Sequence, residues 1–196
     1  DARRVLTASA DGTARIWDIS PGNELLELKG HTDIVRTVVL DPDGQRILTA
    51  SADETARVWN ATTGTEVLIL RGHKESLHSA AWSPDGQRIL YTLFGVQGKE
   101  QGIWISPATG GPPAIVDKVA GFAPSWSSDG AFVIFNPPRK GLWRYRLGSE
   151  EAPVQFYPRG CDPSPSPDGR WFFCPSSMTI VSSDGKESRT LGQTPG

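Results

Sequence analysis

The side chains best suited to chemistry in this chain are a histidine, a hydroxyl and a carboxylate, His31, Thr49 and Asp53, followed by Trp59. A hydroxyl, an imidazole and a carboxylate in one hydrogen-bonded line form the nucleophile, base and orienting group of many acyl-transfer enzymes. Buried together, the same groups instead form a saturated polar network that only fixes local geometry, because buried polar groups must be paired. We favour the structural interpretation and expect no catalytic residue.

Metal and phosphate chemistry finds little support in the sequence. The histidines are His31, His73 and His78, and neither C-x-x-C nor H-x-x-x-H spacing occurs, so we expect no metal site. Residues 95–99 contain two glycines and a lysine, but they lack the G-K-[ST] ending and the following helix of a phosphate-binding loop. We therefore expect no cofactor.

The polar set lies within a unit that repeats about every 42 residues. Gly30-His31 recurs as Gly72-His73, the dipeptide Asp-Gly recurs at residues 43, 85, 129 and 168, and tryptophans stand at 17, 59, 104 and 143. Within each unit, short apolar runs alternate with turn sequences, which predicts four strands. Self-similarity of this kind indicates a repeat architecture, and four strands per unit is the proportion of a β-propeller blade.

Residues 1–83 resemble WD repeats, on the signatures Gly-His, Pro-Asp-Gly, Ser-Ala-Asp and a terminal Trp-Asp or Trp-Asn. Residues 76–191 are more similar to TolB-type propeller repeats, on Trp-Ser-Pro-Asp-Gly at 82–86 and its looser copies at 126–130 and 166–169. The resemblance implies an all-β fold, a partial propeller of four to five four-stranded blades in an incomplete ring. Because no Gly-His and apolar run precede Arg3, the first blade should lack its innermost strand.

We expect these blades to form a single array without an interdomain linker. The expected boundaries are 1–28 for the incomplete blade and 30–70, 72–117, 121–156 and 160–191 for the others. In WD repeats the strands of a blade are named a to d from the innermost to the outermost, and the resemblance implies the same order here.

The resemblance also assigns a role to the polar set. In WD repeats the His of Gly-His, a Ser or Thr of strand b, an Asp of the b–c turn and the Trp of strand c form a hydrogen-bonded structural tetrad. The implied members are His31, Thr49, Asp53 and Trp59 in the second blade, with Thr7, Asp11 and Trp17 in the first. In the third blade His73 and Trp104 would remain, while Tyr91 stands in the place of Thr49.

Composition limits the range of partners. The chain has 196 residues and a net charge of -2, which argues against a dedicated nucleic-acid surface. No apolar run approaches the ~20 residues that a membrane-spanning helix needs. No signal sequence is visible, so we expect no membrane association and a cytoplasmic location.

We therefore expect a non-catalytic protein-interaction scaffold or sensor propeller that is a fragment of a larger protein, such as a bacterial signalling protein. The alternative is a TolB-like ligand-binding or substrate-gating propeller of a periplasmic assembly or peptidase. The expected partners are proteins or other domains of the parent chain, together with self-association through the open propeller ends. The residues proposed for partner binding lie in two loops and are Gln97, Lys99, Glu100, Arg139 and Lys140.

Cys161 and Cys174 flank the Ser-Pro-Asp-Gly turn of the last repeat. If those four residues are the whole loop, the two cysteines face each other across a hairpin, near enough for sulfur contact. The same rule pairs Phe122 with Phe135 and His78 with Tyr91. Because no export signal is visible, we expect two buried thiols rather than a disulfide.

Overall fold

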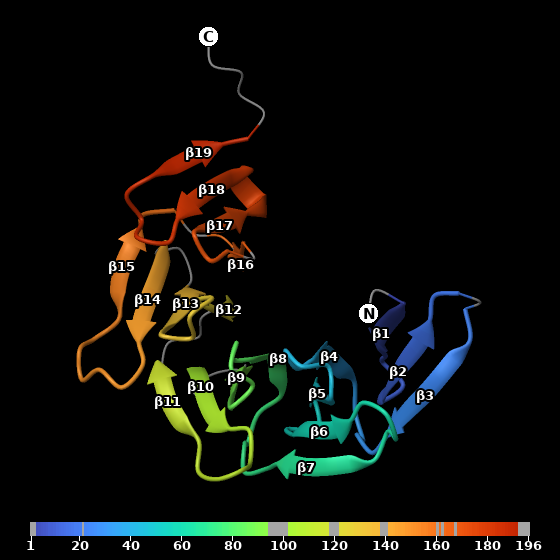
Figure 1. Ribbon diagram of the computed structural model, residues 1–196. Coiled ribbons are helices and arrows are strands. Elements are labelled where there is room, and N and C mark those ends of the chain that lie inside the picture. Colours follow the sequence, from blue (N-terminus) through green and yellow to red (C-terminus); the bar gives the residue numbers. More distant parts are fainter. Residues whose placement is uncertain are drawn as a thin grey trace.

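The computed structural model describes residues 3–20, 22–93, 102–117, 122–137, 141–159, 161, 163–166 and 168–191. Within these residues the chain forms one three-stranded and four four-stranded antiparallel sheets. The sheets follow one another around an arc that is open between the first and the last (Figure 1). We call them blades one to five in chain order.

Nineteen strands build the blades in these described residues. Blade one contains β1 (Arg4–Ala8), β2 (Thr13–Asp18) and β3 (Glu24–Lys29), and blade two contains β4 (Val35–Leu40), β5 (Arg46–Ser51), β6 (Ala56–Asn60) and β7 (Glu66–Leu70). Blade three contains β8 (Leu77–Trp82), β9 (Arg88–Leu93), β10 (Gly102–Pro107) and β11 (Ala114–Asp117). Blade four contains β12 (Phe122–Trp126), β13 (Phe132–Asn136), β14 (Leu142–Arg146) and β15 (Val154–Tyr157). Blade five contains β16 (Ser164–Pro165), β17 (Trp171–Cys174), the short 3-10 helix η1 (Pro175–Ser177), β18 (Thr179–Ser182) and β19 (Ser188–Thr190).

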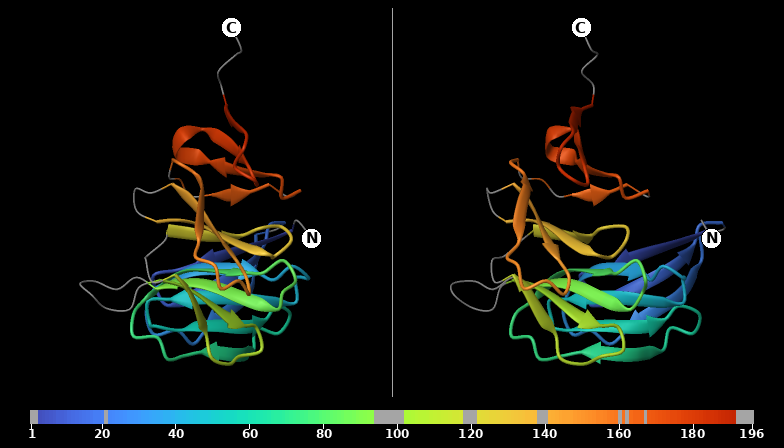
Figure 2. Two further views of the ribbon diagram at one scale, coloured as in Figure 1. Left: turned by 90° about the vertical axis from the view of Figure 1, so that its left-hand side faces the viewer. Right: turned by 60° about the vertical axis from the view of Figure 1, so that its left-hand side comes forward.

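Each sheet follows the chain order, with β4, β8, β12 and β16 on the inner side of the arc (Figure 1). In blade one the register of β1 on β2 places Val5 opposite Trp17, just as β5 on β6 places Ile47 opposite Trp59. The strand β1 therefore corresponds to β5, and the described residues of blade one contain no counterpart of β4. The prediction of an all-β partial propeller with an incomplete ring is confirmed. Figure 2 shows from two further sides that blade five, in red, forms one end of the arc.

The hydrophobic core lies between the blades. Ile47 packs toward blade one in a cluster with Ile16 and Leu28, whereas Leu48 packs toward blade three in a cluster with Leu77 and Ile89. Successive side chains of a strand point to opposite faces, so a strand between two blades is buried on both. This explains why β5 is buried along almost all of its length.

The turn that joins the first two strands of a blade begins one residue later than predicted, so the register of these strands differs from the predicted one. In blade three the amide of Ser83 donates to the carbonyl of Arg88 at 2.9 Å, and the amide of Arg88 donates to the Ser83 hydroxyl at 2.9 Å. Ser83 is therefore the last paired residue of its strand, and the loop is 84–87. As a result Tyr91 faces Ala80, so the predicted pairing with His78 is wrong.

Blade four shows the same shift, since the amide of Ser127 donates to the carbonyl of Phe132 at 2.9 Å. The backbone of Phe122 lies opposite Asn136, so its predicted pairing with Phe135 is also wrong. In blade five the carbonyl of Trp171 accepts from the amide of Ser166 at 2.8 Å, which places the loop one residue later than expected there too.

Cys161 and Cys174 meet in spite of this shift, and they form a disulfide with a Cα–Cα distance of 5.3 Å. The expected contact is present, but the prediction of two free thiols is wrong. Both residues are buried, at 4% and 0% exposure, and their Cα separation lies within the usual range for a bond. The prediction failed because it inferred the redox state from the compartment rather than from this geometry.

Candidate functional site

His31 is the centre of the polar network in blade two. Its Nδ1 lies 2.8 Å from Oδ2 of Asp53, and its Nε2 lies 2.7 Å from Oγ1 of Thr49. The indole Nε1 of Trp59 donates to the same Thr49 oxygen at 2.9 Å. All groups are satisfied when Nδ1–H donates to Asp53 and the Thr49 hydroxyl donates to Nε2. The structure thus joins the four residues of the implied tetrad in one chain of hydrogen bonds.

Burial sets the charges of this network. The side chains of His31 and Asp53 are 1% and 4% exposed, and Thr49 is fully buried. Desolvation lowers the pKa of His31 below its usual 6.5, although the hydrogen bond to Asp53 acts in the opposite direction. Desolvation also raises the pKa of Asp53, but hydrogen bonds from Thr55, His31 and the Thr32 amide outweigh it and leave that pKa lowered. The network therefore holds a neutral imidazole beside a carboxylate at neutral pH.

Blade one contains a shorter version of the network. The indole Nε1 of Trp17 donates to Oγ1 of Thr7 at 2.9 Å. Asp11 accepts from the hydroxyl of Thr13 at 2.6 Å and from its amide at 2.9 Å, and these bonds lower the pKa of the carboxyl. Thr7 is exposed, in contrast to Thr49, so this blade keeps the pairs without sealing them from solvent.

In blade three the tetrad is replaced by aromatic packing. The rings of His73 and Tyr91 meet edge to face with centroids 4.8 Å apart. Trp104 lies directly opposite Tyr91, in the place that Arg57 holds opposite Thr49. The prediction that Trp104 is the counterpart of Trp59 is therefore wrong.

Ser106 occupies the position of Trp59, because it faces Ile89 as Trp59 faces Ile47. A signal after the strand could have revealed this. The amide of Ala108 donates to the carbonyl of Gln87 at 2.8 Å, just as the amide of Ala61 donates to that of Gln45 at 2.9 Å. Counting back from this alanine, rather than from the tryptophan, places Ser106 at the Trp59 position.

The residues predicted to bind partners, Gln97, Lys99, Glu100, Arg139 and Lys140, lie outside the described residues. Their two loops join β9 to β10 and β13 to β14. Across the described part of the chain, no group of three or more His, Cys, Asp or Glu side chains is placed to hold a metal ion. None of its helical segments has the length and apolar character needed to cross a membrane.

Two arginines connect neighbouring blades, and we call them staples. The guanidinium of Arg46 lies 4.5 Å over the ring of Trp82, and its Nη2 donates to the carbonyl of Gly86 at 2.8 Å. Arg88 repeats this one blade later, 5.2 Å over the ring of Trp126 and 3.3 Å from the carbonyl of Gly130. Each staple therefore combines a cation–π contact with a hydrogen bond to the turn of the next blade.

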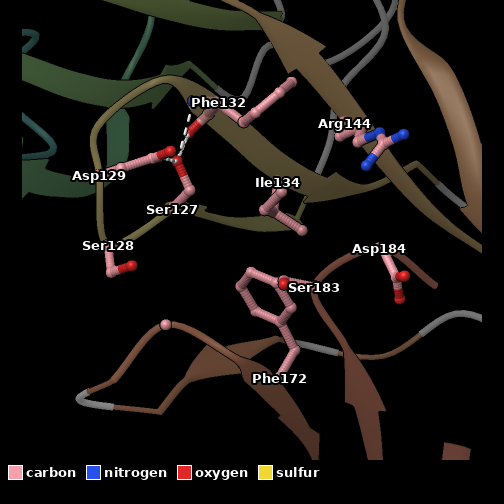
Figure 3. A pocket seen from close by; sticks show the side chains of 10 residues that line it. Ser127, Ser128, Asp129, Phe132, Ile134, Arg144, Phe172, Ser183 and Asp184 are labelled. Carbon is pink, nitrogen blue, oxygen red and sulfur yellow. Dashed lines mark hydrogen bonds between the residues drawn. The ribbon is translucent and has the colours of Figure 1, made fainter. Parts of the chain in front are cut away.

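Among the described residues, no such staple joins blades four and five. Phe132 stands at the position of Arg46 and Arg88, and Pro165 stands at the position of Trp82 and Trp126. A cavity of about 200 Å³ opens there instead (Figure 3). The residues that line this interblade cavity are Ser127, Ser128, Asp129, Phe132, Ile134, Arg144, Gly169, Phe172, Ser183 and Asp184. Sequence reasoning missed the cavity, although the change from arginine to Phe132 after the Asp-Gly turn signals it.

Comparisons with known proteins agree with this architecture. Residues 1–18, 22–60 and 64–92 match the family model "WD domain, G-beta repeat". A 42-residue segment, 21% of the chain, is 50% identical to ribosome assembly protein 4 of Chaetomium thermophilum and covers 8% of that protein. The crystal structure of the Cps50 (Swd1) β-propeller domain of Myceliophteria thermophila superposes with a TM-score of 0.76 at 15% identity, over 91% of this chain and 60% of that chain.

These matches differ in reach. The chain spans less than a tenth of the length of the ribosome assembly protein, and the structural likeness shows the fold alone. The family model covers the three segments between residues 1 and 92, which include the tetrad of blade two. Residues 1–18, 22–60 and 64–92 therefore match WD repeats, and the chain as a whole folds as a partial β-propeller.

Proposed function

We propose that the chain is a non-catalytic scaffold or sensor that binds other proteins as part of a longer polypeptide. The observation that supports this most directly is the burial of Thr49, His31 and Asp53. These are the residues that could act as nucleophile, base and orienting group, yet they hydrogen-bond to one another beneath the surface. A substrate could not reach them, so their role is to stabilise the blade.

Partners would meet the loops at one end of the blades. Because the strands of each sheet alternate in direction, Leu93, Gly102, Asn136 and Leu142 lie at the end of their blades opposite to the Asp-Gly turns. In the sequence, loops 94–101 and 138–140 fall between these strand ends. Loops carried on a rigid scaffold are the usual place for recognition. The regular WD units resemble the repeat arrays of large bacterial signalling proteins, where a propeller acts beside a kinase, NTPase or protease domain. The name of the fungal relative, a ribosome assembly protein, also supports a role in assembling proteins.

A capture experiment tests this proposal. The full chain would be immobilised beside a variant with Gln97, Lys99 and Glu100 changed to alanine. A control variant would carry Gln45→Ala and Gln87→Ala, at exposed positions on the opposite end. We expect the loop variant to lose specific partners that the control retains, with the same melting temperature in all three proteins. If the loop variant captured the same partners as the unmodified chain, loop 94–101 would be excluded as the partner-binding site. The absence of any specific protein partner would contradict the scaffold function.

A second candidate is the TolB-like ligand-binding or gating propeller of an oxidising compartment. The disulfide between Cys161 and Cys174 favours it, because disulfides persist in the periplasm and outside cells and are rare in the cytosol. The scaffold proposal goes with a cytoplasmic location, and this one with export. Blocking thiols at the moment of cell lysis distinguishes the two. Two alkylated cysteines in the chain recovered from its native cells would contradict the second candidate.

A further inference from the structure

Arg144 occupies a position that belongs to the apolar core in other blades. It lies opposite Ile134 in blade four, just as Ile105 lies opposite Leu90 in blade three and Val58 opposite Leu48 in blade two. Ile105 and Val58 are 8% and 1% exposed and pack against the next blade. Blade four therefore presents a guanidinium group where two other blades present an aliphatic side chain.

The surroundings of this guanidinium are aromatic. Its Cζ lies 5.6 Å from the ring centroid of Phe132 and 5.9 Å from that of Phe156. No carboxylate of the described residues lies within ion-pair distance of Arg144. An arginine that is half-buried between two rings without an acidic partner retains its capacity for a bidentate bond to a carboxylate.

Arg144 faces the interblade cavity, together with Asp184 (Figure 3). The carboxylates of this cavity are already held by their own turns. Asp129 accepts from the Ser127 hydroxyl at 2.6 Å, and Asp184 accepts from the Ser182 hydroxyl at 2.7 Å and lies 3.5 Å from the amine of Lys186. Equivalent carboxylates at other turns make the same bond, as Asp85 and Asp168 do. These carboxylates therefore recur from blade to blade, whereas the arginine at position 144 is particular to blade four.

The size of the cavity limits what it can bind. Sites for drug-sized ligands usually measure about 300–1,000 Å³, and this one measures about 200 Å³. It has room for one or two side chains. Its apolar surface comes from Phe132, Ile134 and Phe172.

We propose that the interblade cavity binds an acidic side chain of a partner protein, a glutamate or aspartate next to an apolar residue, through Arg144. The carboxylate pairs with the guanidinium, and the apolar neighbour lies against Phe132 and Phe172. This inference rests on the proposed scaffold function and specifies the chemistry of one partner segment.

Three capped dipeptides test the proposal on the full chain: acetyl-Phe-Glu-amide, acetyl-Phe-Gln-amide and acetyl-Phe-Lys-amide. Their dissociation constants would be measured by ligand-observed NMR titration. We expect the glutamate peptide to bind about tenfold more tightly than the glutamine peptide, because the bond to a charged acceptor is the stronger one. The lysine peptide should bind no better than the glutamine peptide.

Two variants separate recognition from folding. Arg144→Ile restores the residue type found at Ile105, so the melting temperature should rise while the preference for glutamate disappears. Asp184→Asn removes a like charge from the cavity, so the glutamate peptide should bind more tightly. Arg170→Gln is the matched control, because its side chain is 80% exposed and lies outside the cavity lining, and it should change neither value.

Several results would overturn the proposal. These are equal binding of the glutamate and glutamine peptides, preference for lysine, or no binding of the glutamate peptide at about 10 mM, well above the ~1 mM scale of weak specific contacts. A lower melting temperature for Arg144→Ile would show that Arg144 serves the blade interface instead. Failure of the peptides while partner capture still depends on loop 94–101 removes the cavity proposal alone. Failure of partner capture removes the scaffold function itself.

Discussion

The indole of Trp59 and the hydroxyl of Thr49 lie 2.9 Å apart, and that hydroxyl also meets the imidazole of His31. Blade one repeats the indole–hydroxyl pair at the same distance between Trp17 and Thr7, without the histidine. One pair is sealed in a saturated network and the other lies at the exposed end of the arc. The chain thus carries its own internal control for the energetic value of the tetrad.

We expect Asp53→Asn to lower the free energy of unfolding by about 1–3 kcal/mol, because both carboxylate oxygens of Asp53 accept buried hydrogen bonds and an amide has only one acceptor oxygen. Asp11→Asn, the corresponding change in blade one, should cost clearly less, since the side chain of Asp11 is 50% exposed. Urea denaturation of both variants measures the difference. An unchanged midpoint for Asp53→Asn would contradict the structural role of the network.

The stability of the chain should also depend on pH through His31. Its pKa in the folded chain lies below 6.5, so the unfolded chain binds a proton more readily. The stabilising effect of the neutral imidazole is therefore complete above about pH 6.5 and declines as the pH falls toward the folded pKa. Urea midpoints between about pH 5 and 8 should fall on the acid side, and less so in His31→Gln. A wild-type chain that is equally stable at pH 5 would disagree with the lowered pKa.

The two staples should differ in strength. Arg46→Gln breaks an ion pair with Asp41, whose side chain is fully buried, so we expect a loss of about 3 kcal/mol. Arg88→Gln removes a longer pair to Asp85, whose side chain is 53% exposed, and should cost about 1 kcal/mol or less. Thermal melts of the two variants provide the comparison. A larger effect at Arg88 would contradict this ranking, because Arg46 also lies closer to its tryptophan, at 4.5 Å against 5.2 Å.

Mass spectrometry after alkylation tests the disulfide of blade five. In the purified, denatured chain we expect no alkylation of Cys161 or Cys174 until reductant is added, and two alkylated thiols afterwards. Reduction should lower the free energy of unfolding by about 3 kcal/mol, as expected for a closed loop of this size. Cys161→Ser should reproduce that loss under oxidising conditions. Two reactive thiols before reduction would contradict the bond.

The exposed edge of β1 should promote self-association. This strand pairs only with β2 within the described residues, and Val5 is 44% exposed. Unpaired strand edges act as templates for further strands, and a lysine on the edge blocks this. Light scattering should show concentration-dependent growth in mass, reduced by Val5→Lys and unaffected by Gln45→Lys, an exposed position in a turn of blade two. A strictly monomeric wild-type chain at all concentrations would exclude this association.

The fold could be predicted from the sequence because its signals are local and repeated. The Asp-Gly turns and the apolar runs recur at one period, and each recurrence supports the others. The registers could not be predicted in the same way, because Ser83 looks like a loop residue although its hydroxyl clasps the amide of Arg88. Because this residue is paired, the loop begins one position later, and each residue of the second strand faces a partner two positions later than predicted.

The same limit applies to the sites. The tetrad of blade two could be predicted from the sequence, because its residues keep the spacing of a known motif. They are His31, Thr49, Asp53 and Trp59. Trp104 misled the comparison because the b–c connection of blade three is longer, and its indole moved into the place of Arg57. The interblade cavity arises from two replacements, Phe132 in place of an arginine and Pro165 in place of a tryptophan. Their effect could be recognised only once the structure showed that these two positions meet between neighbouring blades.

The staples also give the array a direction. Arg46 and Arg88 each reach forward along the chain to the following blade. Removing blades three to five, or blades four and five, would therefore leave an arginine without its partners on the new last blade. Removing blades from the N-terminal side would leave every remaining staple intact. The effect of truncation on stability should therefore depend on the end that is removed. A protease that cuts between blades three and four should destabilise the N-terminal product more than the C-terminal one.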